Sequence, residues 1–189
     1  MRCPFLIGER VYLRGLELSD LNGNYIAWLN DAQVCQFNSH HVFPYSKEAG
    51  ESYIKHTQSS KQDLILAIVV KHTDQHIGNI ALQCIHPIYR NAEYAILLGE
   101  KEYWGQGYSK EASVLLIQHG FLALNLHRIY CGTSADNVAM QKLAIFMGMK
   151  EEGRRREAMY KNGKYVDVVE YGMTVEDFFN KYQNLPDPA

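Results

Sequence analysis

A glycine-containing loop joins an apolar run to an apolar helix in the middle of the chain. The run 92–98 is predicted to be a buried strand and the segment 109–124 a helix, with Gly105 and Gly107 between them. Glycine allows tight turns and close backbone approaches that a side chain would block. The first N–H groups of a helix are free and carry the positive end of its dipole, so they favour an anion. The loop therefore predicts a site for a phosphate-bearing cofactor.

The spacing of this loop excludes two common nucleotide-binding motifs. A dinucleotide fingerprint requires a third glycine three residues after the second, where this chain has Lys110. It also requires an acidic residue about 20 positions further on, and the segment 125–131 contains none. No Gly-Lys-Ser/Thr run of the Walker type occurs. The alternative to a phosphate site is a turn in which the glycines serve geometry only.

Composition narrows the class of protein. With 47% hydrophobic and 21% charged residues, the chain has the composition of an ordinary soluble globular protein. Its 189 residues are predicted to form one domain, 1–189. The net charge of −2 argues against nonspecific nucleic-acid binding, and no apolar run is long enough to span a membrane. Four scattered cysteines without a C-x-x-C pair are typical of reduced thiols. We expect a cytoplasmic protein with no metal site.

Hydrophobic periodicity and turn residues predict the elements around the glycine loop. A hairpin is expected across Asn162-Gly163, because Asn-Gly is a strong two-residue turn signal. Strands are expected at 11–16, 62–71, 76–85, 92–98 and 128–133, and helices at 18–30, 46–58, 109–124, 138–147 and 175–182. A meander of strands followed by alternating helices and strands is typical of an α+β or mixed-sheet domain.

Several short motifs stand in an order that resembles one enzyme family. They are the strand 11–16 followed by Asp20, and then 28–31, 76–80, 104–109, 125–129, 137–149, 152–153 and 162–167. This order is similar to that of the GNAT superfamily of acyl-CoA-dependent N-acetyltransferases, particularly its Rim-type branch. The resemblance implies an α+β (mixed α/β) fold, with a central, mostly antiparallel twisted sheet of about seven strands flanked by helices. The sheet would be splayed between its fourth and fifth strands.

The resemblance also implies a cofactor, acetyl-CoA, although the acyl group could be longer than acetyl. Trp104 and Ser109 hold the outer places of the pyrophosphate loop, where the family has Arg/Gln and Gly/Ala; Ser109 is small and could cap the helix. Lys110 and Lys142 are candidates for the CoA phosphates, the alternative being solvated lysines. The backbone N–H groups expected to hold the pyrophosphate belong to Gly105, Gln106, Gly107, Tyr108 and Ser109.

Asn137 matches the family's asparagine that reaches the pantetheine or the neighbouring strand, and it also fits the N-cap of the helix 138–147. A main-chain N–H in the stretch Leu97, Leu98, Gly99 would polarise the thioester carbonyl. A bulge at Gly99 would free backbone groups for this purpose; the alternative is that Gly99 only ends the strand.

Glu93 is the predicted general base for direct transfer to an amine in a ternary complex. We expect its strand to be covered on both faces, so that burial raises the pKa of the carboxyl. The alternative is a structural glutamate paired with an arginine or hydroxyl. The family's usual acid, a tyrosine seven residues after the asparagine, is replaced by Ala144, so the acid stays unassigned among Tyr94, Tyr108, Tyr130 and solvent. This gap supports the alternative function, a noncatalytic acyl-CoA-binding or regulatory domain.

The acceptor is expected to bind near the N-terminal helices, the turn 40–45 and the last hairpin. These segments contain aromatic residues but no acidic cluster, which disfavours a polyamine. The resemblance leaves three partners open: a small amine, an aminosugar nucleotide or a protein N-terminus, with the first two preferred. A homodimer is compatible with the sequence, although no surface in the sequence specifies it.

Overall fold

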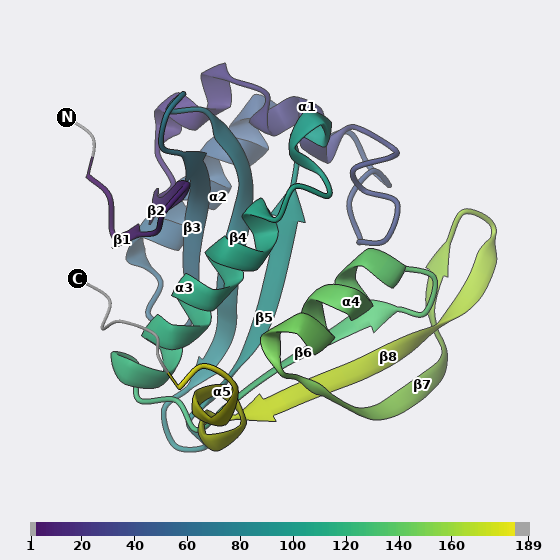
Figure 1. The fold of residues 1–189 in the computed structure, drawn as a ribbon. Helices are drawn as coiled ribbons and strands as arrows, with labels where there is room; N and C mark the ends of the chain where they lie inside the picture. The colour runs from purple at the N-terminus through teal and green to yellow at the C-terminus, as the bar shows by residue number, and fades with distance from the viewer. Residues whose placement is uncertain (1–2, 184–189) are drawn as a thin grey trace.

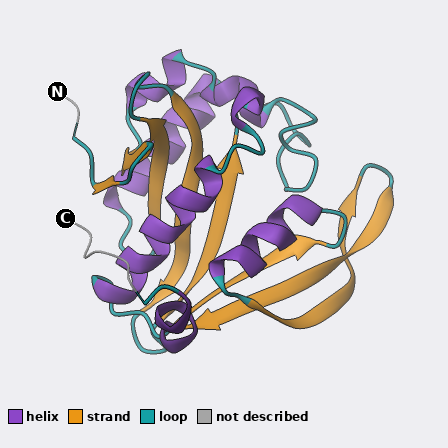
Figure 2. Cartoon of the chain, in the orientation of Figure 1, coloured by secondary structure: helices purple, strands orange, loops and turns teal. Residues whose placement is uncertain are grey.

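The computed structural model describes residues 3–183, in which eight strands form one sheet in the order β1-β2-β3-β4-β5-β6-β8-β7 (Figures 1 and 2). All neighbouring strands are antiparallel except β5 and β6. The strands are β1 (Leu6–Ile7), β2 (Val11–Gly15), β3 (Leu64–Val70), β4 (His76–His86), β5 (Asn91–Leu98), β6 (Arg128–Ser134), β7 (Lys150–Lys161) and β8 (Lys164–Thr174). This confirms the predicted mixed, mostly antiparallel sheet. The two-residue β1 was not predicted, because it is too short to show a periodicity.

Helices cover both faces of the sheet (Figure 1). On one face α3 (Tyr108–Leu122), α4 (Val138–Met147) and α5 (Val175–Lys181) pack over a large apolar core. On the other face α1 (Tyr25–Leu29) and α2 (Lys47–Ser59) pack over a second core. Because successive strand residues face opposite sides, β3 contributes to both cores and is buried along almost its whole length. Among the helices of residues 3–183, none has the length and apolar content that a membrane crossing requires.

The sheet opens between β5 and β6. Their parallel pairing covers only three positions, from Asn91 opposite Arg128 to Glu93 opposite Tyr130. Beyond this point the two strands diverge, and β6 continues in pairing with β8 alone (Figure 1). Residues 94–98 of β5 therefore have no strand on their β6 side, and we call this stretch the open edge. The predicted splay between the fourth and fifth predicted strands is confirmed.

Local sequence signals set most element ends. The Ser46 side chain accepts a hydrogen bond from the Ala49 N–H at the start of α2, and α4 ends at Gly148, whose φ is 100°. The predicted helix 18–30 is wrong, because it is divided into a 3₁₀ helix, η1 (Leu18–Asn22), and α1. The η1 helix ends at Gly23, and its Asp20 side chain bonds back to the Glu17 N–H at 2.8 Å, which closes the first turn on itself.

A buried ionic network ties η1 to the sheet. The Arg14 guanidinium donates to both carboxylate oxygens of Asp20, at 2.9 and 2.5 Å, and His76 Nδ1 lies 3.3 Å from Asp20 Oδ1. Burial of Asp20 opposes its ionisation, but the hydrogen bonds from Arg14 and His76 outweigh burial and hold the pKa of Asp20 well below its usual range. Asp20 is thus a carboxylate whose charge is fully engaged inside the protein.

Candidate active site

The loop between β5 and α3 leaves the start of the helix open. After a short 3₁₀ turn, η2 (Lys101–Tyr103), Gly105 and Gly107 both adopt left-handed backbone conformations, with φ of 74° and 86°. Gly107 is the N-cap of α3 and provides no side-chain cap. A Cβ at Gly105 would meet no atom within 4 Å, so the loop faces open space. The first N–H groups of α3 are therefore available to an anion, as expected.

Side chains at the outer places of the loop fix its shape. Trp104 Nε1 donates to the Leu98 carbonyl at 2.8 Å, which ties the loop to the end of β5. The Gln106 side chain donates to the Glu102 carbonyl. Ser109 does not cap the helix, because α3 already begins at Tyr108; instead the Ser109 carbonyl accepts from Ser113 Oγ at 2.5 Å.

Arg10 is a residue of this site that sequence reasoning missed. Its Nη1 donates to the Gln106 carbonyl at 3.0 Å, and its guanidinium lies 4.6 Å from the centre of the Tyr108 ring. Arg10 Nε forms an ion pair of 3.2 Å with Glu111 in the first turn of α3. Glu111 would otherwise place an uncompensated negative charge beside the anion site. No local signal marks Arg10, because the contact joins the residue before β2 to a loop 96 residues away.

At the end of β5 the backbone groups are already partly engaged. The N–H groups of Gly99 and Glu100 both donate to the Ile77 carbonyl, at 2.9 and 3.1 Å. Two successive residues thus oppose one residue of β4, which is the pattern of a β-bulge, but their N–H groups are engaged and not freed; a separate register shift between β4 and β5 lies between Gln83 and His86. Glycine is required at position 99 for another reason, because a Cβ there would lie 2.0 Å from the Trp28 ring.

The same ladder identifies which backbone groups face the open edge. Alternate residues of an antiparallel strand bond to the same neighbour, so Leu97 shares the orientation of Gly99 toward β4. The N–H groups of Ile96 and Leu98 then point toward the open edge. Since the Leu98 carbonyl already accepts from Trp104, the Leu98 N–H is the polar group that remains at this end of the stretch Leu97, Leu98, Gly99.

Glu93 lies where β5 and β6 still pair, opposite Tyr130 on β6 and Gln83 on β4. Its side chain is half-buried, whereas Ala92 and Tyr94 are buried. The face of β5 that carries Glu93 is thus partly covered, whereas the face that carries Ala92 and Tyr94 is fully covered. Within residues 3–183, the ion pairs of the structure do not include Glu93.

A cavity of about 380 Å³ lies on the α1 and α2 side of the open edge. We call it the tyrosine pocket, because Tyr25, Tyr45 and Tyr53 line it together with residues 95–97 of β5. The remaining lining residues are apolar or neutral polar side chains and one histidine: Leu29, Asn38, Ser39, His40, Ile65, Asn79, Ile80, Ala81 and Gln83. The pocket reaches the stretch of β5 that the splay exposes.

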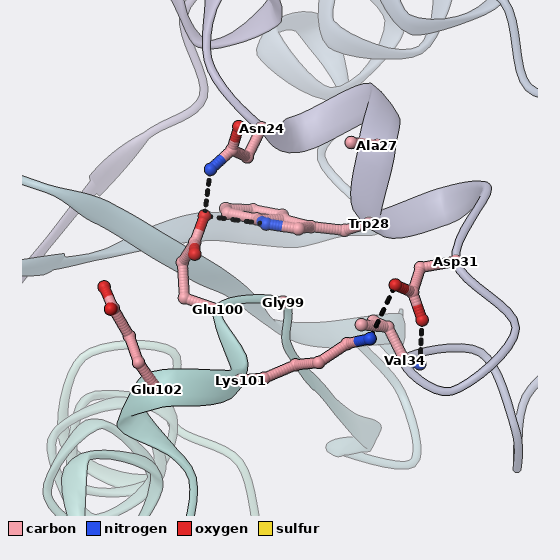
Figure 3. Close-up of a pocket in the computed structure, with 9 residues that line it drawn as sticks. All are labelled: Asn24, Ala27, Trp28, Asp31, Val34, Gly99, Glu100, Lys101 and Glu102. Atoms are coloured by element: carbon pink, nitrogen blue, oxygen red, sulfur yellow. Dashed lines mark hydrogen bonds and ion pairs between the residues drawn. The ribbon is translucent and has the colours of Figure 1, made fainter.

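A second cavity of about 290 Å³ lies where α1 meets the residues that follow β5 (Figure 3). We call it the acidic pocket, because Asp31, Glu100 and Glu102 are among its lining residues. Glu100 Oε1 accepts from Asn24 at 2.7 Å and from Trp28 at 3.0 Å. Asp31 forms an ion pair of 2.7 Å with Lys101. Figure 3 shows these contacts of Asp31 and Glu100; the third carboxylate, Glu102, accepts from the Gln75 side chain at 3.4 Å.

Comparison with known proteins decides the family. The model of the acetyltransferase (GNAT) domain matches residues 10–150, which include the glycine loop and the open edge. The chain belongs to the GNAT acetyltransferase family. GNAT acetyltransferases use acetyl-CoA, so acetyl-CoA is the cosubstrate of this chain.

The alignments with related proteins cover nearly the whole of this chain. An uncharacterized N-acetyltransferase, p20 of Bacillus licheniformis, is 29% identical over 175 residues, covering 92% of this chain and 97% of the relative. The structure of spermidine N-acetyltransferase from Vibrio cholerae with CoA and spermine has a TM-score of 0.82 and 25% identity, covering 90% and 99% of the two chains. The ribosomal L7/L12 alpha-N-protein acetyltransferase RimL, in complex with CoA, has the same fold, with a TM-score of 0.81 at 20% identity and coverage of 90% and 97%.

The other predicted site residues differ in whether their side chains are held by contacts, buried or exposed. Lys110 is placed 4.6 Å above the Phe146 ring, whereas Lys142 is exposed on α4. Asn137 accepts from the Met140 N–H at 3.1 Å, so its N-cap role is confirmed. Ala144 is fully buried. Of the tyrosines considered as acids, Tyr94 is a poor one, because burial strongly raises its pKa.

We expect Arg10→Ala to weaken acetyl-CoA binding about tenfold, because charge-assisted hydrogen bonds of about 1.5–3 kcal/mol hold the loop and compensate Glu111. Calorimetric titration measures the change. The double variant Arg10→Ala/Glu111→Gln removes the uncompensated charge and keeps an acceptor for the Arg10 and Val11 N–H groups, so it should recover most of the affinity. An unchanged dissociation constant for Arg10→Ala would contradict this role.

Proposed function

We propose that this GNAT enzyme transfers an acetyl group from acetyl-CoA directly to a primary amine in a ternary complex, with Glu93 as general base. One observation carries the proposal: the open edge of β5 lies between the glycine loop and the tyrosine pocket. A cofactor held at the loop and an amine held in the pocket would meet at the same backbone stretch. Residues 1–189 would form one domain, acting alone or as a homodimer.

In this proposal the chain's own groups have separate roles. The N–H groups from Gly105 to Ser109, with Lys110 and Lys142 beside them, bind the CoA phosphates. The Leu98 N–H donates to the thioester carbonyl. Glu93 accepts the ammonium proton, directly or through water. The lack of a tyrosine at Ala144 leaves the reaction feasible without a dedicated acid, because a thiol with a pKa of about 8.5 is a good leaving group.

Within the family, we place the chain in the Rim-type branch. Trp104 before the first loop glycine and the small Ala144 support this placement, as does the order of motifs from 11–16 to 162–167. The acceptor is then a small amine, an aminosugar nucleotide or a protein N-terminus. We also propose a cytoplasmic location, which the buried thiols of Cys35 and Cys131 support.

We expect acetyl-CoA to bind with micromolar affinity in calorimetric titration, while ATP and NAD do not bind. Desulfo-CoA should bind as well, because the glycine loop contacts the phosphates and not the sulfur. Release of free CoA in the presence of a panel of amines then tests the transfer. Tight binding of acetyl-CoA without transfer to any amine would favour the noncatalytic acyl-CoA-binding domain, and no binding would exclude both functions.

A further inference from the structure

We infer that the acceptor is a monoamine with an uncharged body, and that this body occupies the tyrosine pocket. The inference rests on the proposed function and specifies its substrate class. It separates this chain from a polyamine acetyltransferase such as the spermidine enzyme to which its fold is similar. A volume of about 380 Å³ is typical of small-molecule sites, which range from about 300 to 1,000 Å³.

The wall of the pocket carries no charge. Its lining residues include no Asp, Glu, Lys or Arg. Burial raises the pKa of Tyr25, Tyr45 and Tyr53, the last to about 12, so all three are neutral phenols at neutral pH. Desolvation, followed by the charge of Lys161, lowers the pKa of His40, so its imidazole is also neutral. The pocket thus offers ring faces, hydroxyls and amides to a ligand.

A network behind the pocket fixes the direction of these polar groups. His76 Nε2 lies 2.9 Å from the Gly78 carbonyl and 2.9 Å from Asn79 Oδ1. These contacts hold the side-chain amide of Asn79, which lines the pocket. The Tyr25 ring packs edge-on against Tyr45, with ring centres 6.5 Å apart, and stacks on His76. These contacts preorganise the wall of the pocket.

The buried carboxylate behind this wall does not attract a ligand cation. Asp20 is the one carboxylate buried among residues 3–183, and Arg14 and His76 engage both its oxygens. The carboxylate nearest along the pocket face of β5 is Glu93, two residues before Ala95. Residues two apart share a face of a strand, so Glu93 lies at the end of the pocket. Glu93 is thus a single carboxylate that can contact a single ammonium group of the acceptor.

A polyamine fits this arrangement poorly. Transfer of a second or third ammonium group into a wall without carboxylates is unfavourable, since a buried charge requires an ionic or hydrogen-bonded partner. An aromatic face accepts one cation near the reacting end, but it does not replace several carboxylates along a chain. The acidic pocket could attract a polyamine, yet Asp31 and Glu100 are already engaged there (Figure 3), and Glu102 accepts a hydrogen bond from Gln75.

Steady-state acetylation of matched amines tests the inference on the full chain. Phenethylamine and hexylamine serve as monoamines, and 1,6-diaminohexane and spermidine as polycations. We expect kcat/KM to be at least about tenfold higher for the better monoamine than for either polycation, since each unpartnered charge disfavours binding. Preference for spermidine would overturn the substrate class and leave the proposed function standing. Acetyl-CoA binding without acetylation of any amine would overturn both.

A gain of function sharpens this test. Asn38 lines the pocket, and its Oδ1 accepts from the His40 N–H at 2.9 Å. Asn38→Asp keeps this acceptor and adds a negative charge, so the ratio of spermidine to monoamine turnover should rise about tenfold. Asn125→Asp is the matched control, because Asn125 Oδ1 also accepts a hydrogen bond, from Arg90, outside the pocket. An unchanged ratio in Asn38→Asp with retained monoamine turnover would mean that the body of the acceptor lies elsewhere.

Discussion

Glu93→Gln should lower kcat by a factor of about 10² to 10⁴, the usual contribution of a general base. The change removes the proton acceptor at the point where β5 and β6 separate, but it keeps the size and hydrogen-bonding capacity of the side chain. Because Glu93 is distant along the strand from the glycine loop, the dissociation constant of acetyl-CoA should change less than about threefold. Steady-state kinetics and calorimetric titration measure the two quantities.

Glu170→Gln is the matched control for this experiment. Both carboxylates influence the titration of Tyr130 and Cys131, so they lie in one region of the sheet. Glu170, however, forms an ion pair of 2.6 Å with Arg155 and is held as a structural carboxylate. We expect its variant to retain turnover within about threefold. Turnover within the same range for Glu93→Gln would show that Glu93 is not the base.

Asp20→Asn should destabilise the protein by about 3–5 kcal/mol, which is typical of breaking one partner of a buried ion pair. Only 4% of the Asp20 side chain and 13% of the Arg14 side chain are exposed, so solvent cannot replace the lost partner. The free energy of unfolding, measured with urea, reports the change. Asp31→Asn is the control, because solvent reaches both members of the Asp31–Lys101 pair and an exposed pair contributes little to stability.

The stability difference between the wild type and Asp20→Asn should become smaller in acid. The pKa of Asp20 is lowered in the folded state, so its contribution is fully present above the unfolded pKa of about 3.9 and is lost as the pH falls. The difference in unfolding free energy between the wild type and Asp20→Asn should be constant from neutral pH to about pH 5. It should then shrink in more acidic solution. A difference that does not change down to pH 2 would contradict the assignment.

Features set by neighbouring residues could be predicted from the sequence. The Asn162-Gly163 turn forms with φ of 53° and 80°, and α4 begins and ends where Asn137 and Gly148 indicate. The glycine loop follows the same rule, because left-handed backbone conformations at two glycines depend on the chain immediately around them.

Features created by distant contacts could not be predicted. The sequence suggested a bulge or a strand end at Gly99, but it did not show that the Trp28 ring, 71 positions earlier, also requires a glycine there. Arg10 reaches the glycine loop from the turn before β2. The tyrosine pocket assembles side chains from α1, α2 and the three strands β3, β4 and β5. A single sequence without a structure places each of these residues in an element but does not place them beside one another.

The edge strand β7 affects how the protein behaves in concentrated solution. β7 is the outermost strand, and all its residues from Lys150 to Ala158 are exposed. Its register with β8 shifts twice, after Glu151 and after Arg155, and its exposed part is rich in charged side chains. Charges and irregular register discourage a further strand from adding to an edge. The longest strand of this fold thus protects it against ordered aggregation into fibrils.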